Sequence, residues 1–367
     1  MQHVIKGRGS LNATNLAAMM ERLNMQRPLL VCSARMQADF IRRTGLDLPI
    51  FSGYHANPDL ADAVAGADLY RAQGCDGLIS VGGGSAMDTA KAVKALLLAG
   101  DMEKVRKSDL PDGVHLPHIA IPGTAGTGAE ATPIAVVYVN NEKLSLDHPA
   151  LLPEGILLDA SLLDTLPLYH KKACAMDALC QGIESFWAMK ATPESRIHAE
   201  RAIRGVLRHI DAYLAGDEAA AEAVLEAAYE SGCAIRISRT TAAHAMSYQI
   251  TKRVGPAHGH ACMLTLPHLW RHMGEVPVLA ELNTLMGTAD GASLLLGLLA
   301  ATEMLPDALP DDATLDALAT SVNTQRLGNH PEALTTAELR DIYVQALAPV
   351  EAKERARLAQ LWRAYAG

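Results

Sequence analysis

The chain has 367 residues, which is more than one hydrophobic core usually organises, so its length predicts two domains. Hydrophobic residues make up 49% of the chain, charged residues 20% and aromatic residues 4%, which is the composition of a globular protein. The formal net charge of −9 argues against a general nucleic-acid-binding protein.

The cysteines, the N-terminus and the longest apolar run indicate where the protein works. Six cysteines are scattered without a C-x-x-C pair, which is the pattern of reduced thiols in a cytoplasmic protein. Residues 1–10 lack the apolar run of a secretion signal, and the apolar stretch at 293–305 is too short to span a bilayer. We therefore expect a cytoplasmic protein that binds neither membranes nor nucleic acids.

The first part of the chain alternates short apolar runs with helical patterns. Buried strands are expected at residues 27–33, 49–53, 77–84 and 118–123. Alternation of strands and helices is typical of a doubly wound α/β domain with a parallel sheet. Beyond about residue 165, long alanine- and leucine-rich helical patterns dominate. The sequence therefore predicts an α/β domain at residues 1–163 and a helical domain at residues 164–367.

Three consecutive glycines, residues 82–84, lie between a predicted strand and a predicted helix. Glycines let a phosphate approach the backbone, and the amides and dipole of the following helix attract negative charge. Ser85 and Asp88 have the spacing of a capping box at the start of that helix.

A second glycine-containing turn occupies residues 121–132, where Thr124 and Thr127 offer hydroxyl groups and Glu130 would complete a second capping box. Either turn alone also fits an ordinary tight connection between a strand and a helix. Two such turns in one alternating domain favour a nucleotide-binding cradle, although the G-x-G-x-x-G fingerprint of an ordinary Rossmann fold is absent.

An acid and an amide stand one helical turn apart at Asp177 and Gln181, in a predicted helix that also carries Glu184. This spacing places both side chains on one face of the helix. The pair fits part of a metal site, a buried polar network or an accident of a helix surface, and further ligands are needed to decide.

His244 and His258 are 14 residues apart, a rise of about 21 Å along a continuous helix, which no single ion bridges. The intervening Gly255-Pro256 should end the helix and return His258 toward His244. Each histidine alone is more often structural than a ligand. Together with the acid and the amide, however, they form a four-ligand set that suits a divalent transition metal.

These motifs resemble those of the iron-containing (group III) alcohol dehydrogenases, and the resemblance extends over essentially the whole chain. The most specific segments are GGGSAMDTAK (82–91), PGTAGTGAEAT (122–132), LPEGILLDASLLDTLP (152–167), MDALCQGIES (176–185) and HGHA (258–261). The resemblance implies a Rossmann-like α/β domain followed by an all-α domain, as in dehydroquinate synthase. It also implies an NAD(P)-dependent and metal-dependent alcohol dehydrogenase or aldehyde reductase, with a homodimer as the expected assembly.

In that family an Asp and three histidines hold the catalytic metal. By position, the resemblance makes Asp177, His244 and His258 ligands of a divalent ion, Fe²⁺ or else Zn²⁺. Gln181 stands where most members carry a histidine. Either its amide oxygen coordinates the metal as a weaker donor, or Gln181 only hydrogen-bonds Asp177 and leaves three protein ligands.

The resemblance assigns the first domain to the nicotinamide cofactor. The positions implied to contact it are Ser33, Asn57, Gly83, Gly84, Ser85, Asp88, Thr124, Thr127 and Lys143. NAD-preferring members end the first of the predicted strands with an Asp, whereas this chain has Ser33 there and Arg35 nearby. The missing carboxylate and the nearby guanidinium favour a 2′-phosphate, so NADPH is expected to be preferred over NADH.

Within the family, three short segments look most like the phosphonoacetaldehyde reductase branch, whose members reduce phosphonoacetaldehyde to 2-hydroxyethylphosphonate. These segments are residues 51–59, 178–188 and 237–248. Arg239, Lys252 and Arg253 lie in the right part of the chain to bind a phosphonate, although each also fits a plain surface charge. The expected substrate is therefore a small anionic aldehyde, such as phosphonoacetaldehyde or a related phosphonate carbonyl.

His260 and Tyr248, in the metal-binding segment, are candidates for a proton relay, with core packing as an equal alternative. Two other functions fit the same motifs. One is a metal-dependent sugar-phosphate cyclase of related architecture that retains NAD, and the other is a non-catalytic family member that only binds nucleotide or partners.

Overall fold

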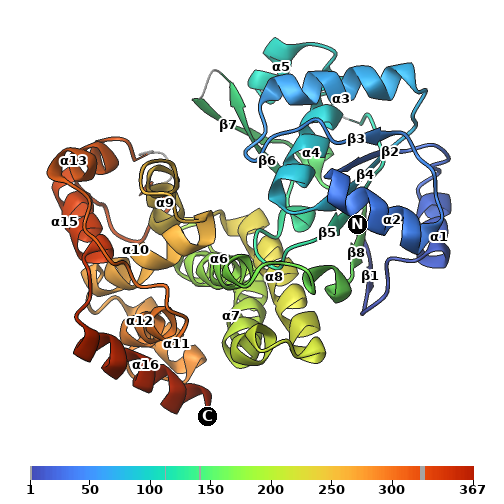
Figure 1. The fold of residues 1–367 in the computed structure, drawn as a ribbon. Helices are drawn as coiled ribbons and strands as arrows, with labels where there is room; N and C mark the ends of the chain where they lie inside the picture. The colour runs from blue at the N-terminus through green and yellow to red at the C-terminus, as the bar shows by residue number, and fades with distance from the viewer. Residues whose placement is uncertain (1, 112, 140–141, 323–326) are drawn as a thin grey trace. The chain divides into compact units, whose positions relative to one another are not determined.

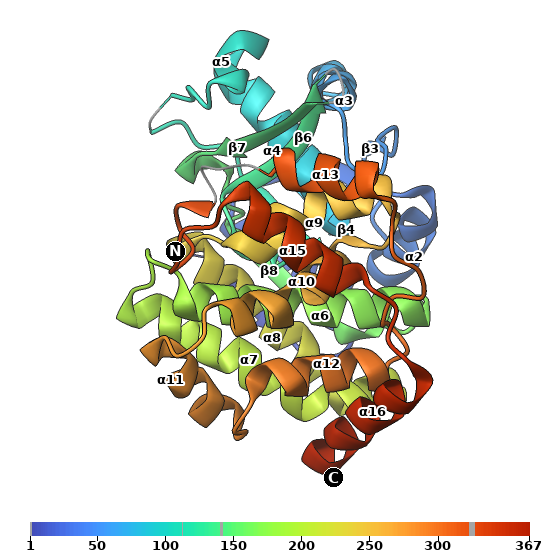
Figure 2. The same ribbon diagram turned by 90° about the vertical axis from the view of Figure 1, so that its left-hand side faces the viewer.

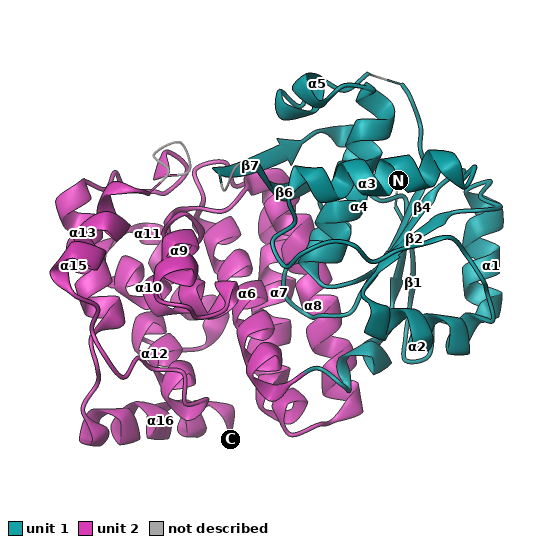
Figure 3. Ribbon diagram, turned by 45° about the horizontal axis from the view of Figure 1, so that its top comes forward, with its two compact units in different colours: residues 1–166 teal, residues 167–367 magenta. Residues whose placement is uncertain are grey.

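The computed structural model describes residues 2–111, 113–139, 142–322 and 327–367 (Figure 1). The chain divides into two compact units, unit 1 at residues 1–166 and unit 2 at residues 167–367 (Figure 3). The sequence placed this division between residues 163 and 164. Pro167 directly precedes the first long helix of unit 2, where its missing N–H leaves no hydrogen bond unmade.

Unit 1 is built on a six-stranded sheet with the strand order β1-β8-β5-β4-β2-β3. Every pair of neighbouring strands in this sheet is parallel, which confirms the predicted parallel sheet. The strands are β1 (His3–Lys6), β2 (Leu29–Cys32), β3 (Ile50–Phe51), β4 (Leu78–Gly82), β5 (His118–Pro122) and β8 (Gly155–Leu158).

Both faces of the sheet are covered, because alternate residues of each strand point to opposite sides. Leu29 and Val31 pack in one cluster with Leu60 of α3. Leu30 and Cys32 pack in a second cluster with Phe40 of α2. The helices of this unit are α1 (Ala13–Arg22), α2 (Ala34–Thr44), α3 (Leu60–Ala72), α4 (Gly84–Ala99) and α5 (Met102–Arg106).

A separate antiparallel pair, β6 (Ile134–Val139) and β7 (Glu142–Asp147), follows β5 in the chain. A bridge between Asp59 and Tyr138 joins this pair to the start of α3. The described part of unit 1 also contains the 3₁₀ helices η1 (Ala129–Ala131), η2 (Pro149–Leu151) and η3 (Ala160–Leu163).

All the regular secondary structure in the described residues of unit 2 is helical, as the alanine- and leucine-rich patterns predict (Figure 2). Helices α6, α7 and α8 pack on one another, and α10 packs on α6, α9 and α12. The helices in its described residues are α6 (Leu168–Trp187), α7 (Pro193–Leu214), α8 (Glu218–Ser238), α9 (Ala242–Arg253), α10 (His258–His272), α11 (Pro277–Met286), α12 (Gly291–Ala301), α13 (Asp312–Thr320), α15 (Thr336–Leu347) and α16 (Ala352–Ala366).

Among the described residues, no single helix has the length and apolar character needed to cross a membrane. The bent pair formed by α11 and α12, with an angle of 48° between its helices, meets that test by length and composition.

Candidate functional site

The second half of α6 is buried and carries three polar side chains on successive turns. Asp177 and Gln181 are 3% and 4% exposed, and Glu184 is fully buried. Buried groups of this kind need partners, because leaving them unsatisfied costs stability. The partners of Asp177 and Glu184 come from α9, and the hydroxyl that binds Gln181 comes from α8.

The break between α9 and α10 brings the two histidines of unit 2 together. α9 ends at Arg253, Gly255 takes a left-handed conformation with φ of 102°, and α10 begins at His258. The ring centroids of His244 and His258 lie 5.2 Å apart. This confirms the expectation that Gly255-Pro256 reverses the chain and returns His258 to His244.

Gly259 lets the start of α10 approach α6 closely. A Cβ atom at this position would lie 2.5 Å from Asp177 Cβ and 2.9 Å from Asp177 N, and nearer still to the Ala173 carbonyl oxygen. Real side chains do not tolerate such distances. The glycine is therefore the reason that His258 and Asp177, from different helices, reach the same point.

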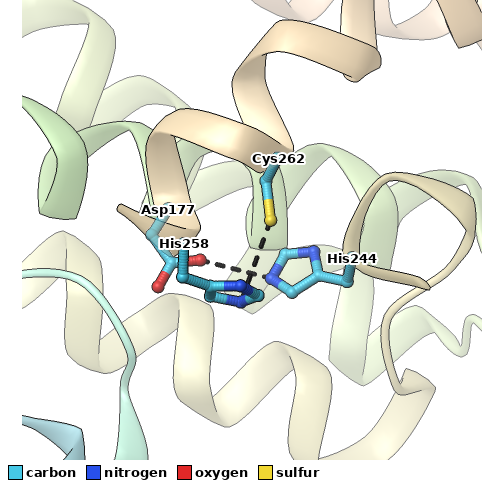
Figure 4. A group of neighbouring side chains, drawn as sticks. All are labelled: Asp177, His244, His258 and Cys262. Atoms are coloured by element: carbon cyan, nitrogen blue, oxygen red, sulfur yellow. Dashed lines mark hydrogen bonds and ion pairs between the residues drawn. The ribbon is translucent and has the colours of Figure 1, made fainter. Parts of the chain in front are cut away.

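Four donor atoms converge there, from Asp177, His244, His258 and Cys262, which we call the donor group (Figure 4). All four atoms lie within 4.8 Å of one another. His244 Nε2 is 3.2 Å from Asp177 Oδ1, and Cys262 Sγ is 3.8 Å from His258 Nε2. The sequence prediction missed Cys262, because its position one helical turn after His258 does not by itself distinguish a ligand from a core thiol.

Each histidine of the donor group is held in orientation by a hydrogen bond at Nδ1, the ring nitrogen that does not point into the group. His244 Nδ1 bonds the Glu184 carboxylate, and His258 Nδ1 lies 3.1 Å from Ser247 Oγ. Tyr248 also stacks on the His258 ring, with centroids 5.2 Å apart. Both Nε2 atoms therefore point into the donor group, which is the arrangement that metal-binding histidines adopt.

Glu184 also organises the start of α9. Its Oε1 accepts hydrogen bonds from the backbone N–H groups of Thr241, Ala243 and His244, and from the Thr241 hydroxyl. Thr241 makes no side-chain capping bond of its own, so the carboxylate satisfies amides that a cap residue would otherwise serve. One side chain thus positions both the helix and its histidine.

The charges in the donor group shift one another's titration. Burial opposes ionisation of Asp177, but the His244 hydrogen bond and the His258 charge outweigh it and lower the Asp177 pKa. Burial also lowers the pKa of His244, but the Cys262 and Glu184 charges and the Asp177 hydrogen bond raise it well above its ordinary value. Burial raises the pKa of Cys262, yet the two histidines bring it down to about 7. The anionic groups here stabilise a buried positive charge on His244, and the same groups would stabilise a bound cation.

The donor set fits a divalent transition metal, because imidazole nitrogen, carboxylate oxygen and thiolate sulfur are all established ligands of such ions. Asp177, His244 and Cys262 are buried, whereas His258 is partly exposed. The structure thus brings together three of the four ligand residues that the sequence predicted, Asp177, His244 and His258. It places Gln181 beside them, with its Nε2 3.4 Å from Asp177 Oδ1.

His260 lies outside the donor group. Its Nε2 is 2.7 Å from the Met304 carbonyl oxygen, and its Nδ1 is 3.2 Å from the Tyr169 hydroxyl. The Tyr169 hydroxyl in turn accepts a hydrogen bond from Ala257 N. These bonds tie the start of α10 to α6 and to the segment after α12.

The three cations predicted to bind substrate lie at two helix ends. Arg239 follows α8 with a positive φ of 64°, and its Nη1 donates to the Arg236 carbonyl at 2.8 Å. Lys252 and Arg253 are exposed in the last turn of α9, and Arg253 Nε donates to Gln249. None of the three belongs to the donor group.

In unit 1 the two glycine turns pack against each other at the ends of neighbouring strands β4 and β5. Gly123 N donates to the Gly82 carbonyl at 2.8 Å. A Cβ on Gly83 would come within 3.3 Å of the Thr124 methyl group, and one on Gly84 within 3.3 Å of the Thr127 methyl group. Any larger residue at either position would press on its threonine neighbour, so glycine favours this close packing of the two turns.

Both predicted capping boxes are wrong. The residue that caps α4 is Gly83, with no side-chain bond, and Asp88 instead accepts a hydrogen bond from the backbone of Val136. Glu130 lies in the single turn η1, whose cap is Gly128, and its side chain is buried. A helix start without a side-chain acceptor is also one whose amides can serve an anion.

Other predicted cofactor positions gather around these turns. Asn57 has a positive φ of 59°, and its N–H lies 3.3 Å from Ser85 Oγ. Burial raises the pKa of Asp88 to about 6, and the positive charge of Lys143 partly opposes this increase. Ser33 is exposed at the end of β2, where it caps α2, and Arg35 donates to the Thr165 carbonyl at 2.9 Å.

Comparisons with known proteins agree with this architecture. A family model described as "Iron-containing alcohol dehydrogenase" matches residues 2–160, and one described as "Fe-containing alcohol dehydrogenase family, C-terminal" matches residues 172–347. A solved structure of sulfoacetaldehyde reductase from Bifidobacterium kashiwanohense in complex with NAD⁺ superposes with a TM-score of 0.84. It is 25% identical, and the match covers 95% of this chain and 98% of that one.

Two curated relatives are similar in sequence. Phosphonoacetaldehyde reductase of Streptomyces viridochromogenes is 40% identical over 238 residues, which are 61% of this chain and 60% of the relative. NAD-dependent methanol dehydrogenase of Bacillus methanolicus is 30% identical over 281 residues, 72% of each chain. The matched segment thus spans less than two thirds of the length of the first relative.

Proposed function

The chain belongs to the iron-containing alcohol dehydrogenase family, and on this premise we propose that it is a metal-dependent, nicotinamide-linked aldehyde reductase. The observation that carries the proposal is the donor group of unit 2, in which both histidines turn their Nε2 atoms toward a shared centre. The glycine turns of unit 1 support the nicotinamide cofactor.

Residues of the chain have separate tasks in this proposal. Asp177, His244 and His258 hold the metal, while Glu184 and Ser247 keep the imidazole rings in the orientation that presents Nε2. When bound, the metal polarises the aldehyde oxygen and the reduced nicotinamide supplies the hydride. Burial of Asp177 and His244 keeps water from competing for the ligand atoms.

Fe²⁺ is proposed as the metal on the family name, and NADPH as the preferred cofactor on Ser33. A serine at the end of β2 offers no carboxylate to repel a 2′-phosphate. Arg35 donates from Nη2 to the Thr165 carbonyl, and the other N–H groups of its guanidinium are proposed to pair with that phosphate. The related sulfoacetaldehyde reductase was solved with NAD⁺. The proposed preference for NADPH therefore rests on this chain's own residues and not on that structure.

The proposed substrate is phosphonoacetaldehyde or a closely related small anionic aldehyde. Two of the similar proteins are named for aldehydes that carry a phosphonate or a sulfonate group. Such a group needs cationic donors, and Arg239 with Lys252 and Arg253 are proposed to supply them. One well-placed charge-assisted hydrogen bond contributes about 1.5–3 kcal/mol, or about 10- to 150-fold in selectivity.

The test is steady-state reduction of an aldehyde panel with NADPH and with NADH, using protein loaded in turn with Fe²⁺, Zn²⁺ and Mn²⁺. We expect phosphonoacetaldehyde to be reduced far better than propanal, and Arg239→Ala to weaken only the anionic substrate. Equal efficiency toward both aldehydes would refute the anionic substrate but not the reductase. Absence of net NADPH oxidation by any aldehyde would favour the cyclase or the non-catalytic alternative.

A further inference from the structure

The family's fourth metal ligand is a histidine at the position of Gln181, so the fourth donor of this chain needs separate identification. Gln181 Oε1 lies 2.8 Å from Ser231 Oγ, whose single hydrogen is shared with the Ala228 carbonyl oxygen, also at 2.8 Å. Gln181 Nε2 faces Asp177 Oδ1 at 3.4 Å. An amide NH₂ group is a donor of hydrogen bonds and offers no lone pair to a metal. As oriented, Gln181 supports Asp177 rather than completing the set.

Cys262 supplies what Gln181 does not. It lies four residues after His258 on α10, so both side chains project from the same face of the helix. Its side chain is fully buried, and its Sγ is one of the four converging donor atoms. Figure 4 shows the sulfur pointing to the same centre as the two imidazole rings and the carboxylate.

We propose that Cys262 Sγ is the fourth protein ligand of the metal, giving an Asp, His, His and Cys set in which Gln181 takes no part. This inference rests on the metal of the proposed function but not on the reaction. Metal–nitrogen and metal–oxygen bonds of about 2.0–2.2 Å and a metal–sulfur bond of about 2.3 Å give edges of roughly 3.3–3.6 Å in a tetrahedron. Two of the six edges between the donor atoms are 3.2 Å and 3.8 Å, close to these values, and all six lie within 4.8 Å.

Coordination by Cys262 changes the charge of the site. The S–H bond breaks, the metal–sulfur bond forms, and the proton leaves to solvent. The two anionic ligands of the metal are then one carboxylate and one thiolate, beside the two neutral imidazoles. Two anionic ligands neutralise a divalent ion, whereas one carboxylate with neutral Gln181 would leave a charge of +1. The chain should therefore bind the ion more tightly than a glutamine-completed site would, and it should accept thiophilic ions such as Zn²⁺ and Co²⁺ readily.

Cobalt substitution tests the proposal directly. The protein loaded with one equivalent of Co²⁺ should show a thiolate-to-cobalt charge-transfer band in the near ultraviolet. Gln181→Ala should keep the band, and so should the matched control Cys180→Ala, which removes a different buried thiol. Cys262→Ser and Cys262→Ala should lose it and should bind Co²⁺ at least about 10-fold more weakly.

X-ray absorption of the unaltered protein loaded with Zn²⁺ provides a second readout that needs no variant. One sulfur neighbour at about 2.3 Å from the zinc supports the proposal, and a first shell without sulfur overturns it. A charge-transfer band that survives Cys262→Ala also overturns it. Neither measurement requires turnover, so an inactive protein that shows zinc–sulfur coordination would refute only the proposed reductase.

Discussion

Both units bury charged side chains, but they use them in different ways. In unit 1, Lys91 is fully buried, and its Nζ donates to the carbonyl oxygens of Ala129 and Ile134 and to the Thr132 hydroxyl. An ammonium group has three N–H bonds, and here each has an acceptor. In unit 2, His244 is equally enclosed, yet its Nε2 and the neighbouring donors point at one common centre.

We interpret the Lys91 charge as structural and the donor group as the proposed metal site. Lys91 ties α4 to the segment that carries η1 and leads into β6, and its hydrogen bonds are complete within the protein. The donor group instead collects acceptor atoms that repel one another unless a proton or a metal lies between them. A buried titratable residue therefore indicates a binding site only when its atoms are directed at a shared point.

The largest expected effect comes from removing a ligand of unit 2. His258→Ala should abolish metal binding and lower kcat/KM by at least about 10³-fold, because the metal contributes several kcal/mol of charge stabilisation. Metal analysis and steady-state kinetics measure both. His170→Ala, which changes an exposed histidine on α6, serves as the control and should alter neither. A fully active His258→Ala enzyme would show that the histidine is no ligand.

Removing the buried charge of Lys91 in unit 1 should instead lower only the stability of the fold. Lys91→Met leaves buried carbonyl groups without a donor and removes a positive charge near Asp88 and Glu130. We expect a loss of about 2–4 kcal/mol in the free energy of unfolding, with metal content unchanged. Urea denaturation and metal analysis check this together. Loss of the metal from folded Lys91→Met would contradict the separation of the two units' roles.

Glu184→Gln should sharpen the account of how His244 is held. The amide keeps the shape of the side chain but not the negative charge that bonds His244 Nδ1. Metal affinity should fall about 10- to 100-fold, as is usual when the outer partner of a ligand is changed. Competition with a chelator gives the affinity. If the affinity stays unchanged, the carboxylate serves only to cap α9.

The smallest expected effect is a change in pH dependence within unit 1. Burial raises the pKa of Glu130 from 4.5 to about 7, so the folded state holds a proton that the unfolded state has lost between these values. Stability from this group should therefore decrease as pH rises from about 4.5 to about 7. Glu130→Gln should flatten that decrease, as followed by urea midpoints across this range. An identical slope in both proteins would show that Glu130 titrates normally.

The fold was readable from the sequence because its signals are local. Apolar runs alternating with helical patterns indicated β2, β4 and β5 in a parallel sheet, and Gly255-Pro256 indicated the break that joins the two histidines. The prediction of capping boxes was wrong because the spacing of residues does not determine where a side chain points. Asp88 instead accepts a hydrogen bond from the backbone of β6.

The donor group could be predicted only in part, because sequence signals are local and one of its members depends on a tertiary contact. Asp177, His244 and His258 are metal-ligand residue types with an informative spacing, but Cys262 looks like any core thiol in a helix. Its role depends on the close approach of α10 to α6 at Gly259, which is a tertiary contact. The outer partners Ser247 and Ser231 carry no sequence signal at all, since a serine hydroxyl can bond almost any neighbour.

The central claim is that the donor group of unit 2 holds a metal on which activity depends. The most direct measurement is the metal content of the purified protein, followed by aldehyde reduction before and after removal of the metal with a chelator. The account predicts about one divalent ion per chain, loss of activity on its removal, and recovery when Fe²⁺ or Zn²⁺ is returned. Full activity in protein stripped of metal would contradict it.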